Sequence, residues 1–344
     1  MDILIGLLII AVGAFCQSSC YVPINKVRAW NWESYWLVQG VFAWLVLPLL
    51  GALLAVPAGH SLLELLTRAD GFHLTMTVLF GVLWGVGGLT FGLSMRYLGV
   101  ALGQSIALGT CAALGTVMGP VLLQAMSLEA DAMSRLTTSV ILGVVVTLAG
   151  IAIIGVAGKM KADGLSEEEK TKAVKDFNFT KGIAIALLSG LMSGCFNVGL
   201  EFGKDINFGG LTPDIFKTLP ATFLVTLGGF ATNAVYCLWQ NGRNHSWGDY
   251  GKRSVWANNL FFCILAGALW YSQFFGLALG KGFLTASPTL LTLSFCILMA
   301  LNVVFSNVWG IILKEWQGCS RPTVAVLVLG IAVLIFATFL PQLI

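Results

Sequence analysis

The sequence predicts an all-α membrane protein that crosses the bilayer ten times. Three observations lead to this prediction: the apolar composition, the length of the apolar runs and their number. Hydrophobic residues make up 57% of the 344 residues and charged residues only 10%, and the mean hydropathy is +0.88. A soluble domain carries about 25% charged residues, because its surface faces water. Lipid as the outer solvent removes that requirement, so a soluble fold is excluded.

Ten apolar runs approach or exceed the roughly 20 residues that a helix needs to cross the hydrocarbon. In the first half of the chain they lie near 3–23, 37–57, 74–95, 99–123 and 136–157. In the second half they lie near 182–203, 215–240, 256–280, 284–313 and 322–341. The first run has no basic residues before it and no clear cleavage site, so we interpret it as a retained helix. The ninth is long enough to tilt, kink or end in a surface turn. Strands are not expected, because the runs do not alternate as in outer-membrane barrels.

A charged stretch, 158–181, separates residues 1–157 from residues 182–344, and each of these parts is expected to hold five helices. We interpret the stretch as a solvated cytoplasmic linker, with a regulatory contact as the alternative. Within it, Ser166 and Glu169 have the spacing of a helix capping box, which predicts a short surface helix.

The distribution of lysine and arginine predicts the orientation, because cytoplasmic loops carry an excess of these residues. One alternating set of loops holds 14 of the 19 basic residues, and the other set holds only Arg68, Arg135, Lys204, Lys217 and Lys281. The first set is expected on the cytoplasmic side. Both termini are then expected on the outer side, which is the periplasm if the source is Gram-negative.

A weak internal repeat relates the two halves. Residues Phe91 to Leu93 read Phe-Gly-Leu, as do residues Phe275 to Leu277, 184 residues later, and the same offset aligns the second and third runs with the seventh and eighth. Five helices are an odd number, so the two halves must insert in opposite senses. This predicts an inverted repeat, which many secondary transporters use for alternating access.

Small residues recur at spacings that suit close helix packing. Glycine pairs four residues apart occur at Gly81/Gly85, Gly99/Gly103, Gly115/Gly119, Gly190/Gly194 and Gly276/Gly280. We interpret them as packing positions, with a rocking interface as the functional alternative. The eight cysteines lie mostly inside apolar runs at spacings unlike a metal site or a disulfide framework, which indicates apolar filler.

Several segments resemble the L-rhamnose–proton symporter family of the drug/metabolite transporter superfamily. They run from Cys20 to Glu33, from Phe80 to Gly99, from Leu269 to Phe275, and from Leu313 through Arg321-Pro322. They follow the order and length of the family over nearly the whole chain. The resemblance implies ten helices in the drug/metabolite transporter fold, and sugar uptake coupled to a cation, with L-rhamnose as the default substrate. The middle of the chain, from the fourth to the seventh run, departs from the family pattern.

A neutral sugar needs hydrogen-bonding side chains for its hydroxyls and aromatic faces for its C–H surfaces. Polar residues inside a membrane usually face the interior of the helix bundle, so those within the runs are candidates. The candidate substrate-binding residues are Gln17, Trp84, Gln104, Asn197, Asn233, Trp270, Tyr271, Gln273, Asn302 and Asn307. Trp270, Tyr271 and Gln273 form the favoured cluster. For each candidate the alternative is a purely structural bond, and for Asn302 and Asn307 bonding between helices is the favoured interpretation.

Proton coupling requires a titratable group that can be desolvated, and Glu201 is the candidate because it lies at the edge of a long apolar run. The alternative is an interfacial residue paired with its neighbours. Glu33 and Glu315, near Lys26, could form a cytoplasmic gate, although with Trp30, Trp32, Trp36 and Trp316 they are better explained as anchors in an aromatic belt.

These features together predict a secondary importer of L-rhamnose driven by proton symport, multi-pass in a bacterial inner membrane. Substrate is expected near the midplane between the halves. No catalytic residues, metal site or cofactor are expected: there is no phosphate-binding loop, and the three histidines lie in loops. The net charge of +3 gives no sign of nucleic-acid binding. The alternatives are a carrier for another sugar or metabolite, an exporter or Na⁺-coupled protein, and a membrane enzyme or receptor. The sequence leaves the oligomeric state open.

Overall fold

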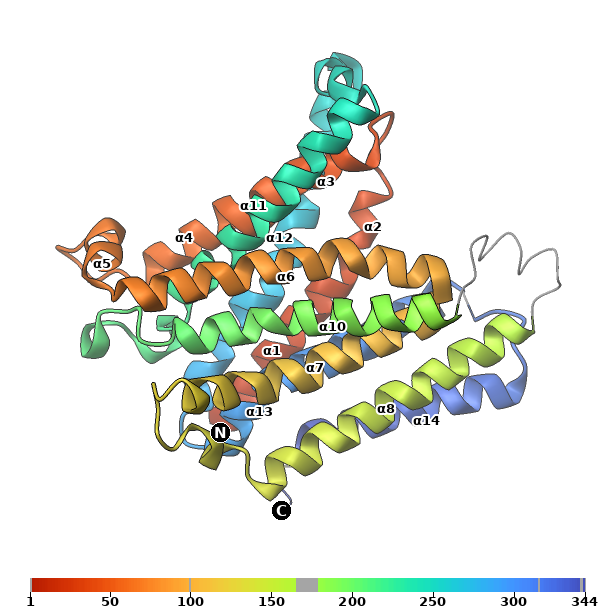
Figure 1. Cartoon of the computed structure of the whole chain (residues 1–344). Helices are drawn as coiled ribbons and strands as arrows, with labels where there is room; N and C mark the ends of the chain where they lie inside the picture. Colours follow the sequence, from red (N-terminus) through yellow and green to blue (C-terminus); the bar gives the residue numbers. More distant parts are fainter. Residues whose placement is uncertain (1, 99, 165–178, 315, 341–342, 344) are drawn as a thin grey trace. The chain divides into compact units, whose positions relative to one another are not determined.

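The computed structural model describes residues 2–98, 100–164, 179–314, 316–340 and 343 (Figure 1). Among these residues, ten helices are long and apolar enough to cross a membrane, and they coincide with the ten predicted runs. The described part contains no strand. The prediction of an all-α polytopic membrane protein is confirmed. The predicted surface helix after Ser166 lies outside the described residues.

The first five spans begin with α1 (Asp2–Ser19), which continues into α2 (Tyr21–Ile24). The second span consists of α3 (Trp32–Gly40), the π-helical η1 (Val41–Val46) and α4 (Leu47–Leu54); the next three are α6 (Gly71–Leu98), α7 (Val100–Ala125) and α8 (Thr138–Asp163). The other five are α10 (Phe179–Phe202), α11 (Leu219–Arg243), α12 (Arg253–Phe283), α13 (Pro288–Ile312) and α14 (Arg321–Phe339). Short connecting helices are α5 (Leu62–Arg68), η2 (Ala132–Arg135), η3 (Gly209–Leu211), η4 (Asp214–Phe216) and η5 (Ser246–Gly251).

Serine and proline residues fix the start of two late helices. The Ser287 hydroxyl accepts a hydrogen bond from the backbone N–H of Leu290 at 3.5 Å, and Pro288 is the first residue of α13. Ser320 caps α14 in the same way. These contacts satisfy backbone donors that would otherwise lack an intrahelical partner. The predicted run 284–313 therefore begins as a turn, and its helix starts only at Pro288.

The second span starts earlier than the sequence predicts, at Trp32 instead of residue 37. A lone carboxylate such as that of Glu33 is costly to bury. In the structure the Glu33 carboxylate accepts hydrogen bonds from Ser246 at 2.6 Å and Asn244 at 3.1 Å. The helix can therefore begin five residues before the apolar run itself.

The chain folds into two compact units. Unit 1 comprises residues 1–85 and 199–286, and unit 2 comprises residues 86–198 and 287–344. Each unit therefore combines segments from both halves of the sequence, and α6 and α10 contribute to both. These units are defined by contacts between residues. The division of the sequence into 1–157, 158–181 and 182–344 is based on the internal repeat, and it stays a prediction.

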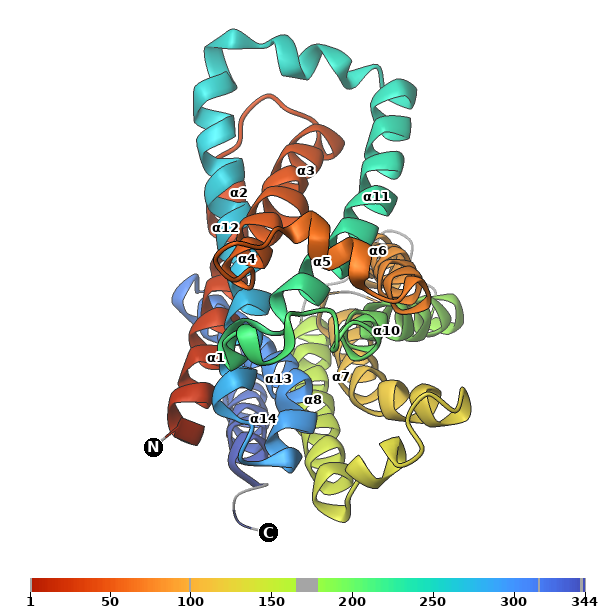
Figure 2. The same ribbon diagram turned by 90° about the vertical axis from the view of Figure 1, so that its left-hand side faces the viewer.

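Unit 1 is held together by helix backbones that approach closely at glycines. Helix α1 runs along α12 (Figure 2). A Cβ atom added to Gly13 of α1 would lie 2.8 Å from the carbonyl oxygen of Ser272, and one added to Gly276 would lie 3.0 Å from the carbonyl of Ile9. On the other side of the unit, Gly81 of α6 faces the backbone of Val225 in α11. These contacts confirm that Gly81/Gly85 and Gly276/Gly280 are packing positions. Close packing is needed here because lipid provides no hydrophobic force to bring helices together.

In unit 2, helix backbones also approach closely at glycines. Gly190 and Gly194 of α10 lie against α7, where an added Cβ would meet the carbonyl of Ala107 at 2.6 Å and the amide of Gly115 at 2.9 Å, respectively. Helices α8 and α14 pair along much of their length (Figure 1). Their contact includes an apolar cluster of Ile151, Ile154, Leu327 and Leu334. Small residues therefore set the close contacts, and branched apolar residues fill the rest.

The eight cysteines are free thiols, and six of them are buried. Within the described residues no group of histidine, cysteine and carboxylate side chains could hold a metal ion. The interpretation of the cysteines as small apolar filler fits this placement.

The substitution Gly81→Ala should destabilise unit 1, because the new Cβ would overlap the Val225 backbone, which cannot move aside as a side chain could. Overpacking of this kind costs about 1–3 kcal/mol. The melting temperature of the purified protein in detergent measures the effect. Gly88→Ala on the same helix is the matched control, since no described atom lies within 4 Å of its added Cβ. Equal melting temperatures for the two variants would contradict the packing role of Gly81.

Candidate functional site

A cluster of aromatic rings occupies the interior of unit 1, centred on Trp44 of η1. The Trp44 ring centroid lies 5.5 Å from that of Trp36, 5.5 Å from that of Trp270 and 6.3 Å from that of Trp84. Trp84 and Trp270 also contact each other and Phe274. The cluster joins α3, η1, α6 and α12 by edge and tilted ring contacts, which aromatic pairs prefer.

Glycines make room for these rings. The Trp44 ring lies over Gly40, where an added Cβ would come within 2.6 Å of it, and the Trp84 ring lies over Gly229 of α11. Asn233, one turn after Gly229, accepts a hydrogen bond from the indole N–H of Trp36 at 3.1 Å and donates to the Gly229 carbonyl at 2.9 Å. Three candidates from the sequence (Trp84, Asn233 and Trp270) thus lie in or directly beside one cluster.

The favoured trio of Trp270, Tyr271 and Gln273 is divided by the structure. Trp270 packs in the aromatic cluster, and the Tyr271 hydroxyl lies over Gly51 of α4. Gln273 is buried, and its Cα faces Gly13 of α1. This segment of α12 is therefore partly used for helix packing.

Several buried polar atoms of unit 1 have no hydrogen-bond partner among the described residues. They are Gln17 Oε1, both amide atoms of Gln39, and the ring or hydroxyl donors of Trp30, Trp44 and Tyr271. Sequence reasoning missed Gln39 and Trp44, although Gln39 is an amide inside a predicted apolar run, the signal used for the other candidates. A buried polar group without a partner is costly, so these atoms mark this part of the unit as a candidate ligand site.

Gln104, Asn197, Asn302 and Asn307 belong to unit 2. Asn197 donates to the Gly115 carbonyl of α7 at 2.8 Å, which joins two helices, and its Oδ1 has no partner among the described residues. Asn307 donates to the Val303 carbonyl of its own helix at 2.9 Å, and Asn302 is buried on the same helix. The side chain of Gln104 lies outside the described part. Glu201, the predicted proton carrier, is half-buried one residue before the end of α10, in the part of that helix that belongs to unit 1.

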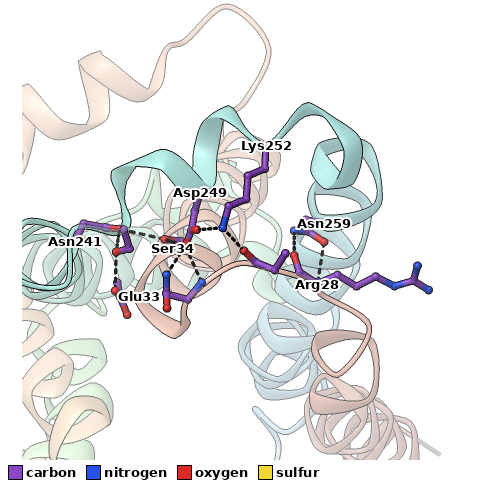
Figure 3. A network of polar contacts seen from close by, with 10 residues as sticks. Arg28, Glu33, Ser34, Asn241, Asp249, Lys252 and Asn259 are labelled. Carbon is purple, nitrogen blue, oxygen red and sulfur yellow. Dashed lines mark hydrogen bonds and ion pairs between the residues drawn. The ribbon is translucent and has the colours of Figure 1, made fainter.

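A network of polar side chains closes the end of unit 1 at which α3 and α12 begin and α11 ends (Figure 3). The Asp249 carboxylate of η5 accepts from Lys252 Nζ at 2.6 Å, from the Asn31 backbone at 2.7 Å and from Ser34 Oγ at 2.9 Å. Asn241 accepts from Ser34 at 3.0 Å and from Ser246 at 2.8 Å. The network includes the two bonds of Glu33 described above. Two carboxylates are therefore buried and hydrogen-bonded.

The same network fixes the loop before α3. Asn259 of α12 accepts from the Arg28 backbone N–H at 3.0 Å and donates to the Arg28 carbonyl at 2.8 Å (Figure 3). Lys252 also donates to the Ala29 carbonyl at 2.6 Å. Glu33 thus bonds to η5 and to the end of α11. The sequence suggested instead a gate of Glu33 with Lys26 and Glu315, and Glu315 lies outside the described residues. Of the predicted aromatic belt, Trp32 is exposed, whereas Trp36 turns into the aromatic cluster.

Hydrogen bonding controls the charge of Asp249. Burial alone would raise the pKa of its carboxyl. The hydrogen bonds from Lys252, the Asn31 backbone and Ser34 favour the ionised form more strongly, so the pKa lies below its ordinary value. Asp249 is consequently a stable anion that organises the loop.

Comparison with known proteins decides the family. The family model described as "L-rhamnose-proton symport protein (RhaT)" matches residues 1–343. The chain belongs to this family. Similar proteins include the L-rhamnose-proton symporter of Cronobacter sakazakii, 31% identical over 344 residues that cover 97% of this chain and 96% of the relative. The symporter of Escherichia coli K12 (strain DH10B) is 31% identical over 95% of this chain and 93% of its own length. The symporter of Yersinia pestis (strain Pestoides F) is 31% identical over 97% of this chain and 96% of its own length.

Membership in the symport family applies to the whole chain, because the match runs from one end to the other. Both units therefore belong to a multi-pass membrane transport protein. The resemblance noted in the sequence is confirmed.

The substitution Asp249→Asn should lower the stability of the protein by about 1–3 kcal/mol, the range for hydrogen bonds to a charged group. Because the folded pKa is depressed, the contribution of Asp249 is complete above the unfolded value near 3.9 and is lost as the pH falls through the lower folded value. Melting temperatures in detergent between about pH 6 and pH 3 test this. The variant should lose most stability at the upper end of that range and converge on the wild type at the acidic end.

Asp131→Asn, at an exposed loop position, is the control. A constant difference between Asp249→Asn and wild type at every pH would contradict the assignment of a buried anion.

Proposed function

We propose that this protein imports L-rhamnose together with a proton across a bacterial inner membrane. The observation that carries the proposal is the family match over residues 1–343, and the full-length similarity to three L-rhamnose-proton symporters supports it. The aromatic cluster of unit 1 suits the ligand chemically. L-Rhamnose is uncharged, and its C–H faces pack on indole rings while neutral amide and hydroxyl groups bond its hydroxyls.

The substrate contacts proposed for unit 1 are Trp84, Trp270, Asn233, Tyr271, Gln17 and Gln273. Gln104, Asn197, Asn302 and Asn307 are the candidates of unit 2. Trp84 and Trp270 would supply apolar faces, and the amides would supply donors and acceptors. We also propose that residues 1–157 and 182–344 are inverted five-helix repeats, which would expose the substrate alternately to the two sides of the membrane. The protein would act as a carrier and not as an enzyme.

Purified protein in liposomes should take up L-rhamnose faster when an inward proton gradient is imposed, because the proton would move down its gradient with the sugar. Radiolabelled uptake with and without a protonophore measures this coupling. Uptake of another sugar but not of L-rhamnose would replace the proposed substrate. Equal uptake with and without the proton gradient would contradict proton coupling.

The same assay tests the proton carrier. Glu201→Gln should abolish gradient-driven uptake and leave exchange of L-rhamnose across the membrane intact, since exchange requires no net proton movement. Asp205→Asn, an exposed acid four residues further on, is the matched control. If Glu201→Gln retains gradient-driven uptake, Glu201 is an interfacial residue and the proton moves elsewhere.

The proposed orientation places both termini in the periplasm and the stretch 158–181 in the cytoplasm, because 14 of the 19 basic residues fall in one set of loops. Alkaline phosphatase, which is active only in the periplasm, should be active when fused after residue 344 and inactive when fused after Asp163. The reverse pattern would show that the chain inserts in the opposite sense.

A further inference from the structure

Gln39 differs from the other buried amides of unit 1 in its hydrogen bonding. Only 1% of its surface is exposed, and neither Nε2 nor Oε1 has a partner among the described residues. By contrast, the amide oxygen of Asn241 contacts the hydroxyls of Ser34 and Ser246, and its nitrogen donates to the Cys237 carbonyl and the Tyr250 hydroxyl. Asn233 is also bonded through both its oxygen and its nitrogen. The fold is thus able to satisfy buried amides, yet this one has no partner among the residues that the structure describes.

An unbonded amide inside a membrane span is energetically unfavourable. Hydrocarbon provides no donors or acceptors, and an apolar side chain of similar size would carry no such penalty. Gln39 lies in the span Trp32–Leu54, seven residues after its start. Its amide therefore calls for a partner that is not part of the fold.

The position of Gln39 connects it to the aromatic cluster. Along the contact between α3 and α12, the Tyr35 carbonyl accepts from Cys263 Sγ at 3.7 Å, and one turn further the Gln39 carbonyl lies 3.0 Å from the Cβ position of Gly267. Trp270, three residues beyond Gly267, packs on Trp44. Gln39 therefore lies within about one helical turn of the rings at the centre of unit 1.

A second unpartnered donor lies five residues further along the same span. The Trp44 side chain is 3% exposed, and its indole N–H has no partner among the described residues. Trp44 belongs to the π-helical segment Val41–Val46, which begins two residues after Gln39. Single π-helical turns inside α-helices occur frequently at functional sites. The backbone irregularity and the unpartnered polar atoms thus coincide in one short segment.

We propose that the Gln39 amide and the Trp44 indole N–H bind hydroxyl groups of the transported sugar and determine which sugar is accepted. An amide can accept from one hydroxyl and donate to its neighbour, a pattern that suits the adjacent hydroxyls of a pyranose. Trp270 and Trp84 then cover the C–H face. Neither group is charged, so the site favours a neutral polyol over a carboxylate or an amine. This inference rests on the proposed function and names the residues of the same site that give specificity.

The test is a set of dissociation constants measured by calorimetry on the whole protein in detergent. The ligands are L-rhamnose and its monodeoxy analogues, each lacking one hydroxyl. Gln39→Met should weaken L-rhamnose binding about 10- to 100-fold, as expected for the loss of one or two hydrogen bonds. Two analogues, each lacking one of the two contacted hydroxyls, should lose less affinity between the wild type and the variant than L-rhamnose does. Trp44→Phe, which removes the N–H and keeps an aromatic ring, should show the same behaviour with a different analogue.

Stability provides an independent readout. Without sugar, Gln39→Met should melt at a temperature equal to or above that of the wild type, because it removes a buried amide that no protein group bonds. Asn241→Leu is the matched control: it removes a buried amide whose bonds are all made, and it should melt markedly lower.

Three results would overturn the proposal. One is an unchanged affinity for L-rhamnose in Gln39→Met. Another is an equal loss for L-rhamnose and every deoxy analogue. The third is a melting temperature that falls as far as in Asn241→Leu. A wild-type protein that binds none of these sugars would instead overturn the proposed function itself, so the two failures are distinguishable.

Discussion

Hydrocarbon supplies neither hydrogen-bond partners nor an apolar driving force between helices, and this constraint governs the molecule at every level. Backbone groups are satisfied inside helices, and helix starts are closed by side chains such as Ser287. Attraction between helices must come from close packing. Glycines such as Gly13 and Gly81 bring backbones into contact, and the backbone of a neighbouring helix fills the space that a side chain would occupy.

The same constraint separates two kinds of polar group in unit 1. At one end, Glu33 and Asp249 are buried but accept hydrogen bonds from several side chains and from backbone, so that each charge is compensated. In the aromatic interior, Gln39 and Trp44 are equally buried and have no protein partners among the described residues. The first arrangement is typical of a structural element, because nothing further is needed to complete it. The second is typical of a binding surface, because a ligand can complete it.

The ten spans could be predicted from the sequence because the length of an apolar run is itself the physical requirement for crossing a bilayer. The start at Trp32 could not, because it depends on bonds from Ser246 and Asn244, more than 200 residues away. The candidate site was predicted only in part for the same reason. Asn233 and Gln39 are both amides within apolar runs, and only tertiary contacts distinguish the bonded one from the unbonded one. The two compact units, which mix both halves of the sequence, likewise depend on contacts that no local pattern reports.

Helix α3 connects these two regions of unit 1. Its first turn is fixed to η5 by the bonds of Glu33 and Ser34, and its last turn leads directly into the π-helical segment that carries Trp44. A binding site needs side chains held by a rigid frame, and the charged network supplies that frame at one end of the helix. The departure from α-helical geometry begins only after Gln39, once the helix has been oriented. The irregular turn can therefore place the Trp44 ring over Gly40 and against Trp270 without disturbing the network, which separates the residues that give the unit its stability from those proposed to bind the sugar.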